Sequence, residues 1–210
     1  MCNLYAQAAG PQAIMKASLA TRNDAGNLET GNIYPDYAAP IVRLDAGERI
    51  LATARWGLPS PAFALEGKRV DKGVTNVRNT QSPHWRRWLS PSHRALVPFT
   101  SFSEPGRDSE GKYQPVWFDF ADKRNETPAF FAGIFVPSWT SVRKLKEGEV
   151  TTDLFAFLTT EPSEPVRSIH PKAMPVILTD PADIEAWLNE EWAQAKCLQR
   201  PLPDGHLIRL

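Results

Sequence analysis

This 210-residue sequence has few cysteines, no net charge and no long hydrophobic run. It has two cysteines, and its 24 basic and 24 acidic residues give a formal net charge of zero. Because there is no bulk basic field, any site for a polyanion must be local. No segment approaches the about 18 uncharged apolar residues of a membrane helix, and the start lacks a basic region followed by an apolar run. We therefore expect a reduced, cytoplasmic protein that does not associate with membranes.

Close pairs of metal ligands are also missing, because no group of histidine, cysteine or carboxylate residues has the spacing that zinc requires. We therefore expect no metal and no cofactor. Cys197 is expected to be a small buried side chain on a helix.

Proline, by contrast, is abundant, with 19 residues that fall between short apolar runs. This pattern is typical of many short strands joined by tight turns. Several runs are almost uninterrupted, which indicates burial on both faces or at the closure of a barrel. The expected strands are Asn3–Gln7, Pro40–Leu44, Arg49–Leu58, Arg94–Phe102, Pro115–Phe120, Ala129–Val136, Leu154–Thr160 and Met174–Thr179.

Helices are fewer. Asp180 is a good N-cap before Pro181, and the spacing of Ile184, Trp187 and Leu188 predicts a helix to about Asn189. The other expected helices are Pro11–Ala20, a short turn at Pro83–Leu89, and a stretch from Asn189 through Cys197. The polar segment Ser138–Asp153 is expected to be a long hairpin loop, and the tryptophans Trp56, Trp117 and Trp139 are expected in the core.

Cys2 directly follows Met1, and a small side chain at this position normally allows removal of the initiator methionine. The chain would then begin with a 1,2-aminothiol, whose amine condenses with an aldehyde and whose thiol closes a thiazolidine ring on the same carbon. An α-amine with a pKa of about 7.7–8.0 is roughly one tenth unprotonated at pH 7, far more than a lysine with a pKa near about 10.4.

Three other positions have residues suited to such chemistry. In GVTNVRNT, Asn76 and Arg78 point to the same side of an extended chain, so that one can orient a reacting group while the other holds a phosphate; a solvated loop is the alternative. Glu104 ends an apolar run, where burial can raise its pKa for proton transfer, although it can equally cap a turn. His170, between Ile169 and a proline, is the histidine best placed for acid or base work.

Basic and aromatic residues also alternate in three loops, a mixture that suits single-stranded nucleic acid. Lys68 lies in the first loop, and Arg86 and Arg87 lie beside tryptophans in the second. The third loop contains Arg143, Lys144 and Lys146. The histidines His84, His93 and His206 are expected at the surface.

Five ordered motifs together resemble the SRAP family, the SOS-response-associated peptidase or abasic-site-processing proteins. They are MCNLYA at the start, ARWGLPSP at Ala54–Pro61, TNVRNT at Thr75–Thr80, RALVPFTSFSE ending at Glu104, and FLTTEP with IHPKAMPVIL around His170. The resemblance covers roughly Met1–Leu188. It implies one α+β domain, here residues 1–210, with a barrel-like, mixed but mostly antiparallel sheet, a few flanking helices and a groove for single-stranded DNA.

The resemblance also implies a role for each matching residue. Cys2 would crosslink to the aldehyde of an abasic site, Asn76 would orient the deoxyribose and Arg78 would hold a phosphate. Glu104 would shuttle protons to and from the amine, and His170 would assist sugar ring opening. The partner would be abasic single-stranded DNA, with the protein at the nucleoid when bound, and crosslinking would be accompanied by weak lyase activity.

The chain departs from the family pattern at three motifs, one of which is the aromatic pair around the strand-end acid, replaced here by Phe102, Ser103 and Pro105. Asn3 and Leu4 follow Cys2 in place of the usual Gly-Arg, and TNVRNT lacks the usual glutamate. Two other functions remain open from the residues: a cysteine peptidase that at minimum removes its own Met1, and a DNA- or protein-binding module in which Cys2 is incidental. We expect a monomer, because a groove for one strand needs no second copy.

Overall fold

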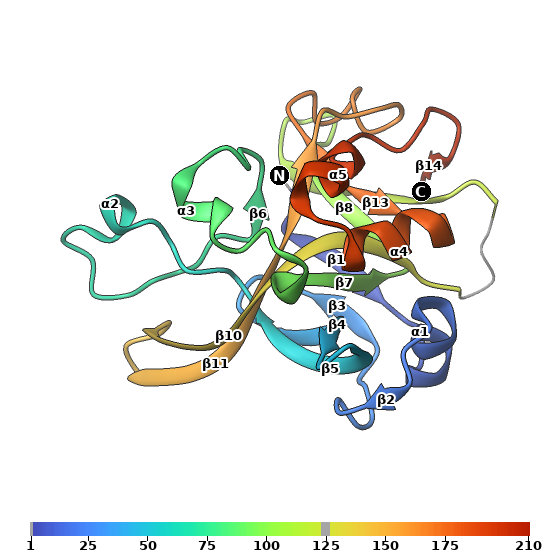
Figure 1. The fold of residues 1–210 in the computed structure, drawn as a ribbon. Helices are drawn as coiled ribbons and strands as arrows, with labels where there is room; N and C mark the ends of the chain where they lie inside the picture. The colour runs from blue at the N-terminus through green and yellow to red at the C-terminus, as the bar shows by residue number, and fades with distance from the viewer. Residues whose placement is uncertain (1, 123–126) are drawn as a thin grey trace.

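The nearly continuous apolar runs of the sequence form a closed barrel. The structure is a computed structural model that describes residues 2–122 and 127–210. The barrel strands are β4 (Ala38–Asp45), β5 (Glu48–Trp56), β7 (Arg94–Phe99), β10 (Ala129–Val142) and β11 (Glu149–Thr160). They pair antiparallel in the order β5-β4-β7-β10-β11, and a parallel pairing of β11 with β5 closes the ring, with Leu154 opposite Arg55 (Figure 1). The expected α+β fold with a mixed, mostly antiparallel barrel is confirmed.

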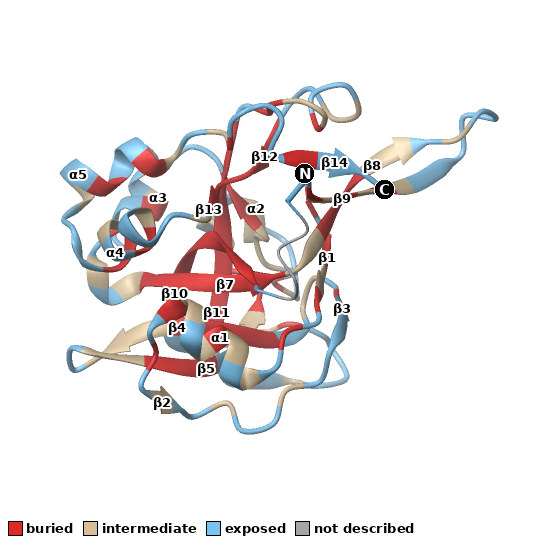
Figure 2. Ribbon diagram, turned by 90° about the vertical axis from the view of Figure 1, so that its right-hand side faces the viewer, coloured by how far each residue is buried: buried red, intermediate tan, exposed pale blue. Residues whose placement is uncertain are grey.

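Both faces of the barrel wall are buried, which is why its strands do not alternate between apolar and polar residues. Phe131 belongs to an aromatic cluster with Tyr5, Phe99 and Phe157, whereas the adjacent Phe130 packs into a second cluster on the opposite face. The rings of Phe99 and Phe131 stack with centroids 3.8 Å apart. Figure 2 shows the central strands as buried and the outer loops and helices as mostly exposed.

A second sheet lies beside the barrel. Its order is β14-β9-β8-β1-β3, formed by β1 (Leu4–Gln7), β3 (Gly31–Ile33), β8 (Ser101–Arg107), β9 (Tyr113–Phe120) and β14 (Leu207–Arg209). The prediction of one strand at Arg94–Phe102 was wrong, because the segment forms two strands that separate at Thr100. The first is β7 of the barrel and the second is β8 of the second sheet. The N–H of Thr100 donates to the carbonyl of Ala6, 2.8 Å away.

Four further strands are short. They are β2 (Arg22–Asn23), β6 (Asn76–Val77), β12 (Met174–Pro175) and β13 (Ile177–Leu178). Strand β6 pairs parallel to β11, with Asn76 opposite Phe157, just beyond the end of β5. The strand predicted at Met174–Thr179 is interrupted at Val176, where pairing passes from β11 to β10.

The helices are α1 (Pro11–Ser18), α2 (Ala62–Leu65), α3 (Pro83–Arg86), α4 (Pro181–Asn189) and α5 (Trp192–Ala195), with 3-10 turns at Pro91–His93 and Lys196–Leu198. The predicted N-cap of α4 is confirmed, because the Asp180 carboxylate accepts from the N–H of Ala182 at 2.8 Å. Among the described residues, no helix has both the length and the apolar character that a membrane span requires.

Three sequence predictions about local structure were wrong. The segment Ser138–Asp153 is not a loop, since β10 continues to Val142 and β11 starts at Glu149, and the two strands project from the barrel as a twisted ribbon (Figure 1). This ribbon is polar because most of its side chains face solvent. Cys197 is exposed in a 3-10 turn rather than buried. Of the three tryptophans expected in the core, Trp56 is buried but Trp117 and Trp139 are only half-buried.

Candidate active site

Cys2 lies two residues before β1 and packs into the core cluster that contains Tyr5 and Phe157. Strand β1 is held between β8 and β3, with Leu4 opposite Ser103 and Tyr5 opposite Ile33. This pairing brings the start of the chain to the middle of β8. The Cys2 side chain is fully buried, and its Sγ lies 3.6 Å from the carbonyl oxygen of Leu4. Met1, whose removal the sequence predicts, lies outside the described residues.

Asn76 contacts the main chain of Cys2 directly. Its Nδ2 donates to the carbonyl oxygen of Cys2 at 2.7 Å and to Oγ1 of Thr75 at 2.9 Å. Its Oδ1 is buried and has no hydrogen-bond partner among the described residues. Since a buried carbonyl oxygen normally accepts a hydrogen bond, this atom is available to a donor on a bound molecule.

Glu104 approaches Cys2 from β8. It lies mid-strand opposite Val116 and is 1 % exposed, so it does not cap a turn, and Pro105 continues the strand rather than ending it. Burial raises the pKa of its carboxyl group from 4.5 to about 7, although a hydrogen bond from the backbone N–H of Cys2 partly offsets this effect. The nitrogen of Cys2 therefore lies beside a buried acid whose pKa is near neutral.

His170 completes the group. Its Nδ1 lies 3.5 Å from Oε2 of Glu104 and donates to the carbonyl oxygen of Ala173 at 2.8 Å. The carbonyl can only accept, so Nδ1 carries a hydrogen, and in the neutral ring Nε2 is the acceptor. The structure thus brings Cys2, Asn76, Glu104 and His170 together from four separate parts of the chain.

The Cys2 thiol is held in its neutral form. Burial raises its pKa well above the ordinary value of 9.0, and the negative charge of Glu104 raises it further. A free thiolate is therefore disfavoured at neutral pH, unlike the low-pKa cysteines of cysteine peptidases.

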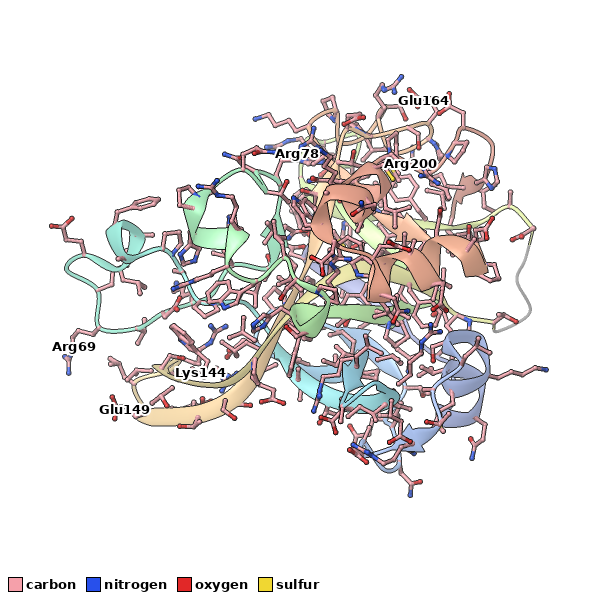
Figure 3. All side chains as sticks on the ribbon, in the orientation of Figure 1. Arg69, Arg78, Lys144, Glu149, Glu164 and Arg200 are labelled. Carbon is pink, nitrogen blue, oxygen red and sulfur yellow. The ribbon has the colours of Figure 1, made fainter. Side chains whose placement is uncertain are left out.

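The cations predicted to bind DNA do not form one group beside Cys2. Arg78 is exposed two residues beyond Asn76, with its guanidinium 3.5 Å from Glu161. Lys68, Arg86 and Arg87 are also exposed, but they lie on the segment with α2 and α3 that projects to one side of the barrel (Figure 1). Figure 3 shows this separation between Arg78 beside β6 and Arg69 at the outer end of the projecting segment.

One basic residue of the predicted loops has a structural role instead. The Arg143 side chain is fully buried and donates to the carbonyl oxygens of Gly57 and Lys72, both at 3.1 Å, and to Asp36 at 3.0 Å. A Cβ at either Gly57 or Gly73 would overlap this guanidinium, so these glycines leave the space that it fills.

Two histidines expected at the surface are partly buried. His84 contacts the carbonyl oxygen of Pro59 at 2.9 Å, and His93 contacts that of Phe135 at the same distance. His206 is exposed, as predicted.

Sequence reasoning missed the residues that position Asn76. The indole N–H of Trp56, at the end of β5, donates to the carbonyl oxygen of Thr75 at 3.0 Å, which fixes the start of β6. The sequence identified Trp56 only as a core residue, because nothing in the local pattern shows which loop its indole reaches. Across residues 2–122 and 127–210 no three potential metal ligands cluster.

Three solved structures have the same fold as this chain. A protein from Bordetella bronchiseptica matches with a TM-score of 0.73 and 22 % identity over 99 % of this chain and 98 % of its own. A protein from Bacteroides thetaiotaomicron matches with a TM-score of 0.71 and 19 % identity over 99 % and 90 %, and a phage-related protein from Bordetella bronchiseptica with 0.70 and 21 % over 100 % and 93 %.

Among curated protein sequences, none matches this chain. The model of one family, described as SOS response associated peptidase (SRAP), matches residues 1–208. Because this match covers almost the whole sequence, the chain belongs to the SRAP family.

Proposed function

We propose that this protein captures abasic sites in single-stranded DNA by forming a covalent bond through Cys2 after removal of Met1, as part of a response to DNA damage. The observation that carries the proposal is that Cys2 lies beside the buried carboxyl group of Glu104, because β1 pairs with β8 and the backbone N–H of Cys2 lowers the pKa of this group. Once Met1 is absent, this nitrogen is an α-amine beside a carboxyl group whose pKa is raised by burial. Such a pair can exchange protons near neutral pH.

The reaction uses the amine first and the thiol second. The unprotonated amine adds to the C1′ aldehyde of the ring-opened deoxyribose, and loss of water gives an imine. The neutral thiol then adds across the C=N bond, with sulfur bonding to C1′ and its proton passing to nitrogen, which closes a thiazolidine. Because this step does not require a free thiolate beforehand, the raised thiol pKa is compatible with it.

The neighbouring residues have separate roles in this reaction. Glu104 carries protons to and from the amine and the departing water. Oδ1 of Asn76, buried and without a partner among the described residues, accepts from a sugar hydroxyl. His170 assists the opening of the sugar ring, and Arg78 binds a phosphate next to the lesion.

The strand would continue from Arg78 toward the projecting segment with α2 and α3. Lys68, Arg86 and Arg87 are exposed there, and the guanidinium of Arg87 lies over the Trp88 ring at 4.0 Å. Exposed cations that follow a phosphate backbone are typical of sites for single strands. If ring closure fails, the imine permits β-elimination, so weak strand cleavage should accompany crosslinking.

Crosslinking to an oligonucleotide with one abasic site tests the proposal. The wild-type protein should give a heat-stable adduct, and Cys2→Ala should give none. Cys197→Ala is the matched control, because it removes the other, exposed thiol and should leave the adduct unchanged. Cys2→Ser should form an imine that borohydride traps but heat reverses, and a heat-stable adduct from this variant would contradict ring closure.

A second candidate function is removal of Met1 by the protein itself. The contact of Glu104 with the Cys2 nitrogen favours it, because that atom is the leaving group when the preceding peptide bond breaks. The thiol would attack the Met1 carbonyl as its proton passes to the Glu104 carboxylate, the same proton would then pass to the departing nitrogen, and water would hydrolyse the thioester to release Met1 and restore the thiol. Intact mass after translation without methionine aminopeptidase tests this function: the wild-type chain should lose Met1 and Glu104→Gln should retain it. Equal processing of both chains would contradict it.

A further inference from the structure

Two tyrosines lie exposed on the turn between β3 and β4. Tyr34 and Tyr37 are 42 % and 53 % exposed, and their ring centroids are 5.5 Å apart at an interplanar angle of 57°. Most large aromatic side chains of this protein are buried in its two cores. An exposed aromatic pair on a short turn therefore provides apolar area that packing does not use.

The pair lies at the same end of its sheet as Cys2. Strands β1 and β3 are antiparallel, with Tyr5 opposite Ile33, so the chain that leaves Ile33 toward Tyr34 runs beside the residues before Leu4. The same turn is hydrogen-bonded to Trp56, the residue that positions the start of β6 and therefore Asn76. The N–H of Trp56 donates to the carbonyl oxygen of Tyr37 at 2.8 Å, and the Trp56 indole fixes the residue that precedes Asn76.

Asp36 holds the turn in a fixed conformation between the two tyrosines. It has a left-handed backbone, with φ of 72°, and its N–H donates to the carbonyl oxygen of Trp56 at 2.8 Å. Its carboxylate binds Arg55 at 2.6 Å, Lys144 at 2.8 Å and Arg143 at 3.0 Å. A network of this kind orders the backbone that carries the two rings before any ligand binds, which lowers the entropy cost of binding.

The surroundings of the pair fit a nucleotide. Tyr37 lines a cavity of about 270 Å³ whose other walls include Thr30, Asn32 and Pro40. The cavity therefore offers backbone and side-chain polar groups next to an aromatic face, the combination that binds a planar base. Beside Asp36, the Lys144 side chain is 45 % exposed, so that it provides a cation for the adjoining phosphate.

We propose that Tyr34 and Tyr37 form a stacking platform for the base next to the abasic sugar. This inference rests on the proposed function, since it places the flanking nucleotide relative to a lesion held at Cys2. The platform would hold the strand on one side of the lesion, while Arg78 binds the phosphate on the other.

Binding to an unreactive lesion tests the platform without crosslinking. A single-stranded oligonucleotide with one tetrahydrofuran residue has no aldehyde, and fluorescence anisotropy gives its Kd. Base stacking on an aromatic ring contributes about 1–3 kcal/mol per base, so Tyr34→Ala combined with Tyr37→Ala should weaken binding about 5- to 150-fold. The double phenylalanine variant keeps both rings and should bind as the wild type does. Tyr113→Ala is the matched control, because Tyr113 is 60 % exposed at the start of β9.

Changes to the DNA complete a double-mutant cycle, in which the loss of the tyrosines is combined with the loss of the base that they would contact. Two further oligonucleotides lack the base on the 5′ or on the 3′ side of the tetrahydrofuran. On one of them, wild-type binding should fall by the same factor, and the double alanine variant should show no further loss. An equal effect of the alanine substitutions on all three oligonucleotides, or no effect on any, would overturn the platform. Absence of a crosslink in a protein that shows the predicted cycle would overturn the proposed chemistry alone.

Discussion

Glu104 makes the stability of this protein depend on pH in a way that can be calculated. Its pKa is raised from 4.5 to about 7 by burial, which corresponds to about 3 kcal/mol at about 1.4 kcal/mol per pKa unit. The folded state binds this proton more tightly than the unfolded state does. The contribution to stability is therefore complete below pH 4.5 and is lost as the pH rises to about 7.

Glu104→Gln removes the titration but keeps a side chain of similar size. The quantity to compare is the free energy of unfolding of Glu104→Gln minus that of the wild type. This difference should rise between pH 4.5 and pH 7, and it should be up to about 3 kcal/mol larger at pH 8 than at pH 4.5. Urea denaturation of both proteins across this range measures the difference. Glu149→Gln, which changes an exposed carboxyl group, is the control and should show no such rise. A difference between Glu104→Gln and wild type that stays constant with pH would refute a buried acid at this position.

The same variant should crosslink abasic DNA at least about tenfold more slowly, because it cannot transfer protons.

Two other substitutions test the stability of the protein around Arg143 and the binding of DNA by Arg78. Arg143→Ala should lower the free energy of unfolding by about 3 kcal/mol or more, because it leaves Asp36 and two carbonyl groups without their buried partner. Lys144→Ala, which removes a 45 % exposed cation from the same carboxylate, should cost less than about 1 kcal/mol in the same urea titration, and equal losses would contradict the structural role of Arg143. Arg78→Ala should weaken binding to single-stranded DNA and lower the slope of log K against log salt by about 0.7 in anisotropy titrations, as expected for one lost phosphate contact. Lys16→Ala, on α1, should leave the slope unchanged, and an unaltered slope for Arg78→Ala would remove Arg78 from the DNA site.

The sequence predicted the barrel because the wall is apolar on both sides. Continuous runs such as Ala129–Val136 indicate strands that are buried on both faces, and this run forms the first part of β10. The same signal failed for the ribbon at Ser138–Asp153, because strands that project into solvent have no apolar pattern. It also failed at Thr100, where one apolar run passes between two sheets.

The candidate site residues were selected by motif, whereas their environment depends on long-range packing. The burial of Glu104 follows from the pairing of β8 with both β1 and β9, which no local pattern specifies. Asn76 is placed by a two-residue strand against β11, too short for any periodicity to indicate. Arg143 resembled a surface cation because its partners Gly57 and Asp36 are distant in the sequence and only the fold brings them to it.

The central claim is that Cys2, freed of Met1, bonds to the lesion through both its nitrogen and its sulfur. The most direct measurement is the mass of the N-terminal tryptic peptide, Cys2–Lys16, after the wild-type protein has reacted with an abasic oligonucleotide and the DNA has been digested. The account predicts a peptide without Met1 that carries the sugar remnant on Cys2 and no longer reacts with a thiol-alkylating reagent. A remnant on a lysine, a Cys2 thiol that still alkylates in the adduct, or an adduct in which Met1 is retained would contradict it.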